Sequence, residues 1–386
     1  MSDNFRAKLR KAKNQGVNSL KKFLNLPSQS KLYGPSGLAT NWLDYNGYSQ
    51  SDVAWQQVYP TIKCHWNPQK TTNWGRYTYN FTKNLKPEIP PTGVVIIPNG
   101  QVMDIQGYTF TKDDQFLVDV SYWRHRLGYA NLPKEKYPTE KIKGTCLSLM
   151  TNASSNYCHF LLDSLPRLHL FYQAGYTLDD VDYILLHQPI SPNAWSIFRQ
   201  LGINESKCQW AKKNTTFQAD TLIATTHPSL NLHHPRWLVD FMTKKIDLKP
   251  CQPQRRLYIP RPTGRRKVAN EDELLSILTE YGFEIFKPEE EVNQPQVFHE
   301  ASIIVASHGA ALSNLVFCQP GTKVLELMSN GHLREYFFTL CQVAGLEHHY
   351  IIGKTTQPIS YVGGLCFHDF IINPTFLTKA LYFLTK

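Results

Sequence analysis

The 386-residue sequence lacks several motifs by which enzyme classes are recognised. It contains no Gly-x-Gly-x-x-Gly fingerprint, no Walker loop and no Gly-x-Ser-x-Gly elbow, so these motifs assign it to no dehydrogenase, P-loop or hydrolase class. No stretch approaches the ~20 apolar residues that span a bilayer, and no signal peptide is visible. These absences predict a cytoplasmic protein, with a peripheral contact at the inner leaflet still open.

Cysteine pairs are missing as well. The eight cysteines are scattered, without a Cys-x-x-Cys pair or the Cys/His spacing of a zinc site. Several lie in apolar runs, where a thiol behaves as a small hydrophobic side chain. This usage favours a reducing compartment. The pair Asp180 and Asp182 has the spacing that holds a metal in some sugar-nucleotide enzymes, but it precedes a predicted strand at the wrong end, so we interpret it as a turn.

Composition and length indicate a globular protein with more than one core. Hydrophobic residues make up 42% and charged residues 19%, and 386 residues predict two domains. The net charge of +10 is compatible with an anionic ligand, nucleic acid or a membrane surface. No nucleic-acid-binding motif is recognisable, which argues against that partner.

The chain divides into three parts. Residues 1–35 form a basic segment in which apolar residues recur at helical spacing through residue 26, which predicts a membrane-surface helix, a solvated tail or an oligomer contact. Residues 36–248 begin with an irregular, strand-containing stretch and become regular near residue 145. Residues 249–386 form a second α/β run. Alternating strands and helices predict parallel sheets, and hence two α/β domains with a cleft between them.

This prediction depends mainly on the stretch from residue 296 to 327. An apolar strand at 302–306 is followed by the small-residue turn 307–311, a helix at 312–318 and a strand at 323–327. Ligands of such βαβ units lie at the carboxyl ends of the strands. The turn therefore predicts a phosphate site, with His308 as its titratable side chain and Glu326 directed to the same edge.

Two further groups of residues suggest chemistry. His159, Asp163 and Arg167 are spaced i, i+4, i+8, so a helix would place them on one face as a base, a carboxylate and a cation. The alternative is a helix start at Asp163 or Ser164 with a salt bridge. The loop 261–267 carries Arg261, Arg265, Arg266 and Lys267 after a predicted strand, which suits a diphosphate, although a solvated basic loop has the same composition.

Taken together, these stretches resemble glycosyltransferase family 61, a group of inverting transferases that includes plant xylosyltransferases and animal O-GlcNAc transferases. The resemblance covers roughly residues 145–330. It rests on the order and spacing of these segments: 157–168, 258–261 with Arg266, 270–273, 281–284, 307–314, Pro320-Gly321 and Glu326. Residues before about 90 have no counterpart, so donor and acceptor stay open.

The resemblance implies a GT-B fold, two Rossmann-like domains facing across a cleft, with the nucleotide-sugar held by the C-terminal one. It implies a metal-independent hexosyl- or pentosyltransferase that needs no cofactor and moves sugar from a nucleotide-sugar, UDP-linked by preference, to a hydroxyl of a glycan, glycolipid or glycoprotein. A bacterial or viral polysaccharide enzyme fits this pattern, with residues 1–26 near a lipid-linked acceptor.

The predicted motifs and the resemblance together suggest roles for individual residues. Asp163 is the leading catalytic base, with His159 second and Arg167 as the neighbouring cation. The nucleotide-sugar site is expected to comprise Arg261, Arg266, Ser307, His308, Gly309, Ala310, Ala311, Asn314 and Glu326, with Glu326 on the ribose. Two rival functions remain: a non-catalytic GT-B-like protein that binds a glycan or nucleotide-sugar, and, less favoured, a nucleic-acid-binding protein.

Overall fold

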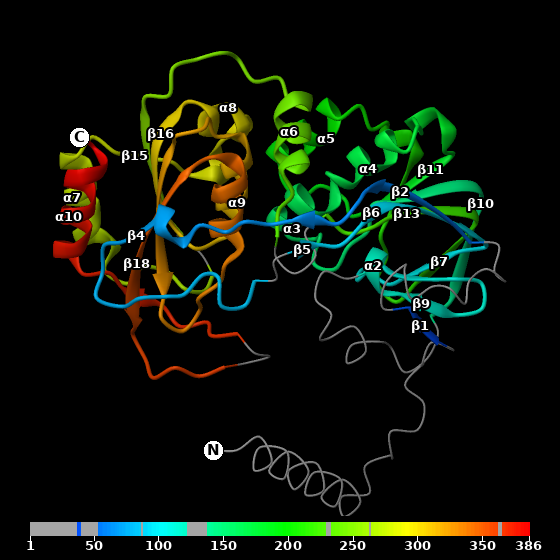
Figure 1. Ribbon diagram of the computed structural model, residues 1–386, viewed down its shortest axis with the longest axis horizontal. Coiled ribbons are helices and arrows are strands. Elements are labelled where there is room, and N and C mark those ends of the chain that lie inside the picture. The colour runs from blue at the N-terminus through cyan, green and yellow to red at the C-terminus, as the bar shows by residue number, and fades with distance from the viewer. Residues whose placement is uncertain are drawn as a thin grey trace, which may run out of the picture.

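The computed structural model describes residues 37–39, 53–85, 88–121, 137–228, 233–261, 264–361 and 365–386. Two large β-sheets, of ten and seven strands, dominate this part of the chain, and helices fill the space between them (Figure 1). The predicted mixed α/β class with parallel strands is confirmed. The basic segment predicted for residues 1–26 lies outside the described residues. In the described part, no helix has the length and apolarity that crossing a bilayer requires.

The first sheet has the strand order β1-β9-β8-β7-β13-β10-β11-β12, with β6 also paired to β13 and β2 to β6. Strands β13, β10, β11 and β12 run parallel to one another, whereas β6 and β7 pair with β13 in antiparallel fashion. Its strands are β1 (Gly37–Ala39), β2 (Ala54–Tyr59), β6 (Thr92–Pro98), β7 (Gln101–Met103), β8 (Tyr108–Phe110), β9 (Gln115–Leu117), β10 (Thr139–Ser148), β11 (Tyr183–Leu186), β12 (Cys208–Trp210) and β13 (Thr216–Thr225).

The second sheet has the order β15-β14-β16-β17-β18-β19, and β4 pairs with β18. All neighbours from β15 to β18 are parallel, as is β4 with β18. Its strands are β4 (Thr71–Asn73), β14 (Arg255–Ile259), β15 (Glu284–Ile285), β16 (Ala301–Ser307), β17 (Lys323–Ser329), β18 (Glu347–Thr355) and β19 (Phe370–Ile371). A separate pair is formed by β3 (Ile62–Lys63) and β5 (Glu88–Ile89).

Helices begin and end where local chemistry predicts. Ser191 caps α5, which has a proline in its first turn. Gly282, one residue beyond the C-cap of α7, and Gly345, the C-cap of α9, adopt positive φ. The α-helices are α2 (Val118–Ser121), α3 (Tyr157–His159), α4 (Arg167–Gln173), α5 (Pro192–Gln200), α6 (Arg236–Lys245), α7 (Glu271–Glu280), α8 (Gln294–His299), α9 (Tyr336–Ala344) and α10 (Pro374–Leu384). A π-helix, η3 (Phe160–Ser164), and a 3₁₀-helix, η8 (Ala310–Phe317), border the site.

One apolar core is shared by the two halves. Helices α3 to α6 lie on the inner side of the first sheet and α8 and α9 on that of the second, so the two helical layers meet in the middle (Figure 1). A single cluster of buried side chains extends through both layers and includes Phe171, Trp237, Leu257, Leu312 and Leu340. The two halves that the sequence predicts as domains are therefore joined by a continuous hydrophobic core.

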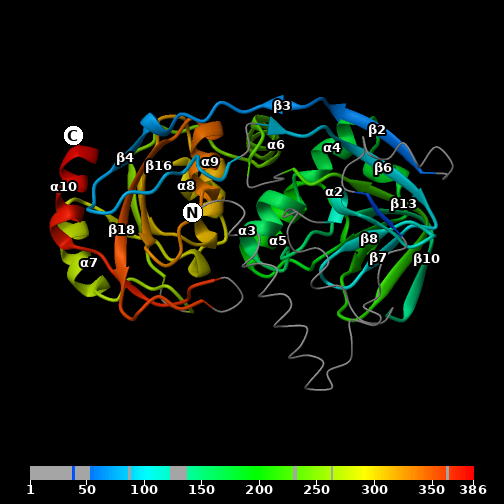
Figure 2. The same cartoon turned by 60° about the horizontal axis from the view of Figure 1, so that its bottom comes forward.

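A stretch near the N-terminus crosses to the second sheet. From β2 the chain passes through β3 to β4, which lies beside β18 (Figures 1 and 2). Phe81 then packs on Phe338 and Tyr350, and the Tyr79 hydroxyl donates to Glu335 Oε1 at 2.5 Å. Sequence alone places this stretch with residues 36–248, whereas these contacts join it to the C-terminal half.

Candidate active site

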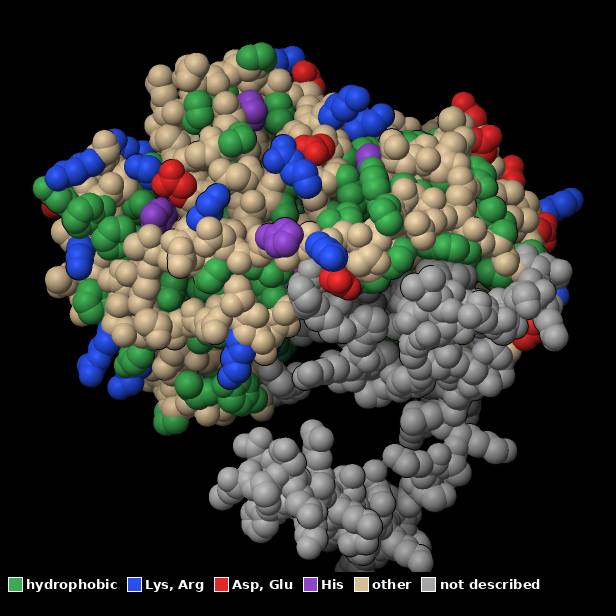
Figure 3. Space-filling view, in the orientation of Figure 1, with side chains coloured by type: hydrophobic (Ala, Val, Ile, Leu, Met, Phe, Trp, Pro, Cys, Tyr) green, Lys and Arg blue, Asp and Glu red, His purple; other side chains and the backbone are tan. Residues whose placement is uncertain are grey.

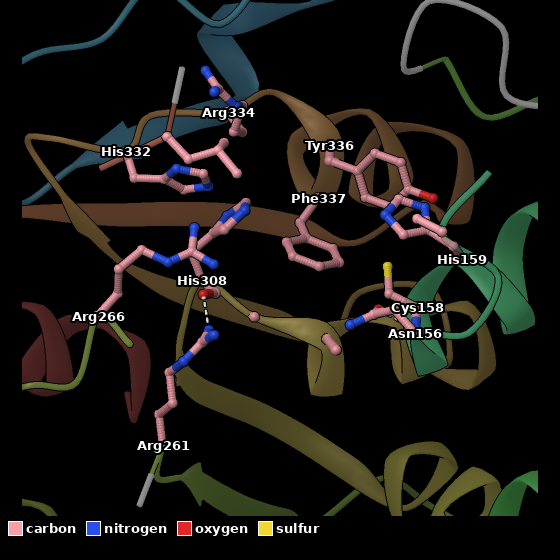
Figure 4. Close-up of a pocket in the computed structure, with 14 residues that line it drawn as sticks. Asn156, Cys158, His159, Arg261, Arg266, His308, His332, Arg334, Tyr336 and Phe337 are labelled. Carbon is pink, nitrogen blue, oxygen red and sulfur yellow. Dashed lines mark hydrogen bonds between the residues drawn. The ribbon is translucent and has the colours of Figure 1, made fainter. Parts of the chain in front are cut away.

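A pocket lies where loops from the two sheets meet, with a volume of about 430 Å³. Its walls include three arginines and three histidines (Figure 4). By contrast, lysines and arginines on the face seen in Figure 3 are dispersed over the surface. The lining residues are Ala153, Asn156, Cys158, His159, Arg261, Arg266, His308, Gly309, Ala310, His332, Arg334, Tyr336, Phe337 and Leu365.

Four loops supply most of these residues, and each follows the carboxyl end of a parallel strand. Residues 260–267 follow β14, residues 308–310 follow β16, and residues 330–335 follow β17; the three strands are neighbours in the second sheet. Residues 149–156 follow β10 of the first sheet. The pocket therefore occupies the edge at which open α/β sheets bind ligands.

Arg261 is held across the turn after β16. Its Nη1 donates to the His308 carbonyl oxygen at 2.7 Å (Figure 4). A Cβ atom on Gly309 would lie 2.5 Å from that nitrogen, so only glycine lets the guanidinium pass here. The backbone of Gly309 is extended, with φ −174°, so contact rather than backbone strain requires glycine.

Arg266 and Arg261 offer buried donors to the pocket. Arg261 Nε and Arg266 Nε and Nη1 are buried and have no hydrogen-bond partner among the described residues. Burial, with the charges of Arg261 and Arg334, lowers the pKa of Arg266 to about 10, so it stays charged at neutral pH. Buried donors without partners cost free energy, which an anionic ligand with several acceptor oxygens would recover.

The loop after β17 adds two residues that the sequence reasoning missed. His332 and Arg334 line the pocket beside Arg266 (Figure 4). Burial, and then His308 and Arg266, lower the pKa of His332 to about 2, so this imidazole is neutral and can accept a hydrogen bond. The signal in the sequence that points to His332 and Arg334 is their position after the buried strand 323–329.

On the opposite wall, His159 and Asp163 form a hydrogen-bonded pair. His159 Nδ1 lies 2.6 Å from Asp163 Oδ2, and the Tyr336 hydroxyl lies 3.3 Å from both carboxylate oxygens. The side chain of His159 is 20% exposed and lines the pocket, whereas that of Asp163 is 1% exposed and does not. Burial alone would raise the pKa of Asp163, but His227 and His159 lower it, so the carboxylate is ionised and His159 donates to it.

The prediction that Arg167 shares this face is wrong. The π-helix η3 interrupts the helix between His159 and Arg167, and Arg167 is fully buried away from the pocket lining. Its guanidinium donates to the carbonyl oxygens of Met150, Val120 and Thr225 and to the Thr225 hydroxyl. Arg167 therefore ties η3 and α4 to the first sheet.

Glu326 also differs from its predicted position. It is fully buried, and both oxygens are occupied, Oε1 by His308 Nδ1 and Oε2 by His348 Nε2 at 2.9 Å. Burial would raise the pKa of Glu326, but His308 and His348 lower it to about 2, so it accepts from both imidazoles. Direct contact of this carboxylate with a ribose is not compatible with that arrangement, because Glu326 supports His308 from behind.

The remaining predicted residues divide into two groups. Gly309 and Ala310 line the pocket, whereas Ser307, Ala311 and Asn314 do not. Asn314 is fully buried and links the two halves of the molecule. It accepts from the Tyr157 hydroxyl at 2.7 Å and donates to Gln294 Oε1 at 2.8 Å.

Metal ligation finds no support among the described residues, which include no group of three or more His, Cys, Asp or Glu side chains able to hold an ion. Asp180 ends the 3₁₀-helix Leu178–Asp180 and accepts from Thr177 N at 2.6 Å, and Asp182 accepts from Thr145 N at 2.8 Å, so both carboxylates bind backbone N–H groups. All eight cysteines are free.

Comparison with known proteins relates part of the chain to an enzyme family. Residues 157–325 match the sequence model of the Glycosyltransferase 61 family. This match assigns residues 157–325 to glycosyltransferase family 61. A stretch of 58 residues is 40% identical to β-1,2-xylosyltransferase RCN11 of Oryza sativa subsp. japonica. That stretch covers 15% of this chain and 11% of the rice protein.

The span matched to family 61 includes residues from both walls of the pocket. His159 and Asp163 lie near its start, and Arg261, His308 and Gly309 lie in its second half. It excludes the loop that carries His332 and Arg334, and the whole of β4 and β18. Part of the site is therefore built by segments outside the span that matches the family.

Proposed function

We propose that this protein is an inverting glycosyltransferase that moves a sugar from a nucleotide-sugar, UDP-linked, to a hydroxyl of a glycan, glycolipid or glycoprotein. One observation carries the proposal. The same pocket has an imidazole–carboxylate pair on one wall and converging arginines with buried, unpaired N–H groups on the other. The imidazole–carboxylate pair can deprotonate the acceptor hydroxyl. The arginines can stabilise the negative charge of the departing diphosphate.

In the proposed reaction, His159 is the general base. Because its Nδ1–H donates to Asp163, its Nε2 is the ring nitrogen that carries a lone pair and accepts the proton of the acceptor hydroxyl. The hydroxyl oxygen forms a bond to the anomeric carbon while the bond from that carbon to the diphosphate oxygen breaks. The electron pair leaves with the diphosphate, and the configuration at the anomeric carbon inverts.

This mechanism reverses the order in which the sequence ranked the two candidate bases. Asp163 was expected first and His159 second, but Asp163 is 1% exposed and lies behind the imidazole. A carboxylate in that position orients the ring and stabilises its protonated form, as in other His–Asp pairs. Tyr336, whose pKa is raised by burial and by Asp163, stays protonated and donates to the same carboxylate.

The leaving diphosphate is assigned to the cationic wall. Arg261 and Arg266 present guanidinium forks, Gly309 and Ala310 present backbone N–H groups, and His308 presents its ring. Preorganised donors of this kind stabilise the charge that develops on the leaving group. These cations would take the place of a divalent metal, so we propose that catalysis is metal-independent and uses no cofactor.

Two facing sheets with a pocket at their carboxyl edges fit the GT-B arrangement, which we propose for this chain. The cytoplasmic location and membrane contact expected from the sequence stay proposals of the same kind.

A direct test is a screen of nucleotide-sugars by thermal shift, because a bound ligand raises the unfolding temperature by mass action. We expect UDP and one UDP-sugar to raise it, and transfer to a hydroxyl acceptor to continue with excess EDTA. Binding without transfer or hydrolysis over a broad acceptor panel would favour the non-catalytic alternative. Loss of transfer in EDTA, restored by Mg²⁺, would refute metal independence.

A further inference from the structure

A chain of hydrogen bonds leads from the pocket to β4, outside the span matched to the family. His308 Nδ1 contacts Glu326 Oε1, Glu326 Oε2 lies 2.9 Å from His348 Nε2, and His348 Nδ1 lies 3.3 Å from the Thr71 hydroxyl. Glu326 and His348 are fully buried. The residue on the pocket is thus connected to Thr71 through two side chains that no ligand can reach.

The strand register explains why these four residues meet. Glu326 pairs with Ala306, two residues before His308; His348 pairs with Val324, two residues before Glu326; and Thr71 pairs directly with His348. Side chains two residues apart on a strand share one face of the sheet. The residues therefore follow one face of the second sheet across β16, β17, β18 and β4.

The direction of each hydrogen bond follows from the charge of Glu326. Since its pKa is lowered to about 2, this carboxylate only accepts, so His308 donates through Nδ1–H and His348 through Nε2–H. With Nε2–H donating to Glu326, Nδ1 of His348 is the ring nitrogen that accepts a hydrogen bond from the Thr71 hydroxyl at 3.3 Å. The ring nitrogen of His308 left for the pocket is Nε2.

Packing fixes the central imidazole as well. The ring of His348 makes edge contacts with Phe81 at 5.2 Å and Phe338 at 5.8 Å, and it stacks on Tyr350 at 6.3 Å. Phe81 belongs to the same N-terminal stretch as Thr71. This stretch therefore holds His348 both by a hydrogen bond and by an aromatic wall.

We propose that His348 and Thr71 are positioning residues of the donor site, which act through Glu326 to aim Nε2 of His308 at the departing diphosphate. The inference rests on the proposed transferase function. When Nε2 carries a proton, it donates to a phosphate oxygen while Glu326 balances the imidazolium charge. The orientation of the His308 ring is set by its contact with the buried carboxylate of Glu326.

Four substitutions test whether this chain of hydrogen bonds positions His308. His348→Leu removes the donor to Glu326, and we expect kcat to fall about tenfold, the order seen when a partner behind a functional histidine is lost. His348→Gln retains an amide N–H within similar reach and should restore most of kcat. Thr71→Val keeps the side-chain shape but removes the hydroxyl, and should lower kcat a few-fold. Thr72→Val is the matched control: it lies on the exposed side of the same strand and should change nothing.

The readouts separate positioning from loss of structure. The donor KM should change less than twofold in all four variants, and unfolding temperatures should not follow kcat. A loss of kcat in Thr72→Val equal to that in Thr71→Val would overturn the proposal, as would wild-type kcat in His348→Leu.

A second measurement does not depend on activity. Two-bond ¹H–¹⁵N spectra of the histidine-labelled protein at pH 8, with His308 assigned from a His308→Asn variant, should show the His308 proton on Nδ1. A proton on Nε2 with none on Nδ1 would overturn the proposed chain of hydrogen bonds. If the wild-type protein transfers no sugar at all, the proposed function fails and this spectrum still decides the present inference.

Discussion

At the residue scale, the pocket assigns different tasks to groups that look alike in the sequence. Both His159 and His308 face the pocket with one ring nitrogen and bind a buried carboxylate with the other. His159 belongs to the half expected to bind the acceptor, and His308 lies within the cationic wall. Because each is paired with its own carboxylate, the two imidazoles can serve opposite ends of one displacement.

The general base is tested by His159→Gln. We expect kcat to fall by about 10²–10⁴, the usual contribution of a positioned base, while the dissociation constant of UDP stays the same. Asp163→Asn should lower kcat too, because an amide can hold the ring in the wrong tautomer. His169→Gln, in α4 and outside the pocket lining, is the control. Equal loss of kcat and UDP affinity in His159→Gln would contradict the assignment.

The diphosphate wall is tested by Gly309→Ala. The new methyl group would lie 2.5 Å from Arg261 Nη1, and since that atom ends a flexible side chain, the guanidinium should move while the fold persists. We expect UDP to bind about tenfold more weakly, as for loss of a charged hydrogen bond, and Arg261→Met to do the same. Isothermal titration would measure it, and unchanged UDP affinity in both variants would refute the site.

At the scale of elements, most strands and long helices were predictable. Residues 302–306 and 323–327 were predicted as strands and form β16 and β17, and residues 374–384 form α10. Apolar, β-branched runs bounded by Gly and Pro carry that information locally. The carboxyl-edge position of His308 followed from this order alone.

Other features depend on tertiary contacts that no local pattern contains. The π-helix η3 turns Arg167 away from the face it would share with His159 in a regular α-helix. The burial of Asp163 and Glu326 depends on neighbours distant in sequence, such as Tyr336 and His348. The segment 312–318, predicted as a helix, is instead the 3₁₀-helix η8, which begins two residues earlier.

A prediction for the element scale concerns Arg167. Arg167→Met would leave the carbonyl oxygens of Met150, Val120 and Thr225 buried without their donor, at about 1–3 kcal/mol each. We expect a loss of at least 3 kcal/mol in the free energy of unfolding, measured by urea denaturation. Arg236→Met, which removes the exposed pair with Asp240 and an exposed 3.3 Å hydrogen bond to the Val343 carbonyl oxygen, should cost less than about 1 kcal/mol. Similar losses in both variants would refute the structural role.

At the scale of the whole molecule, buried histidines link stability to pH. Burial lowers the pKa of His227 to about 3 and that of His234 to about 4, against about 6.5 in an unfolded chain. Between those values the unfolded chain binds protons that the folded protein excludes, so stability falls as the pH falls below 6.5. Each such histidine contributes about 1.4 kcal/mol per pH unit.

Urea denaturation at pH 7.5, 6.0 and 5.0 would measure this dependence. We expect the free energy of unfolding to decrease steadily below pH 6.5, and His227→Gln to show a shallower slope. Glu326, whose pKa is about 2, adds a further loss only below the carboxylate range near pH 4. A flat profile between pH 7.5 and 5.0 would contradict the burial of these imidazoles in neutral form.

The crossing of β4 to the second sheet has a practical consequence for anyone who recombines such enzymes. A chimera cut at the linker near residue 250 would separate β18 from its neighbour and leave an open strand edge, which invites aggregation. The same cut would remove Tyr79 and Asn84 from Glu335. A C-terminal half grafted onto another N-terminal half should therefore be combined with residues 66–85, supplied as a linked or co-expressed peptide.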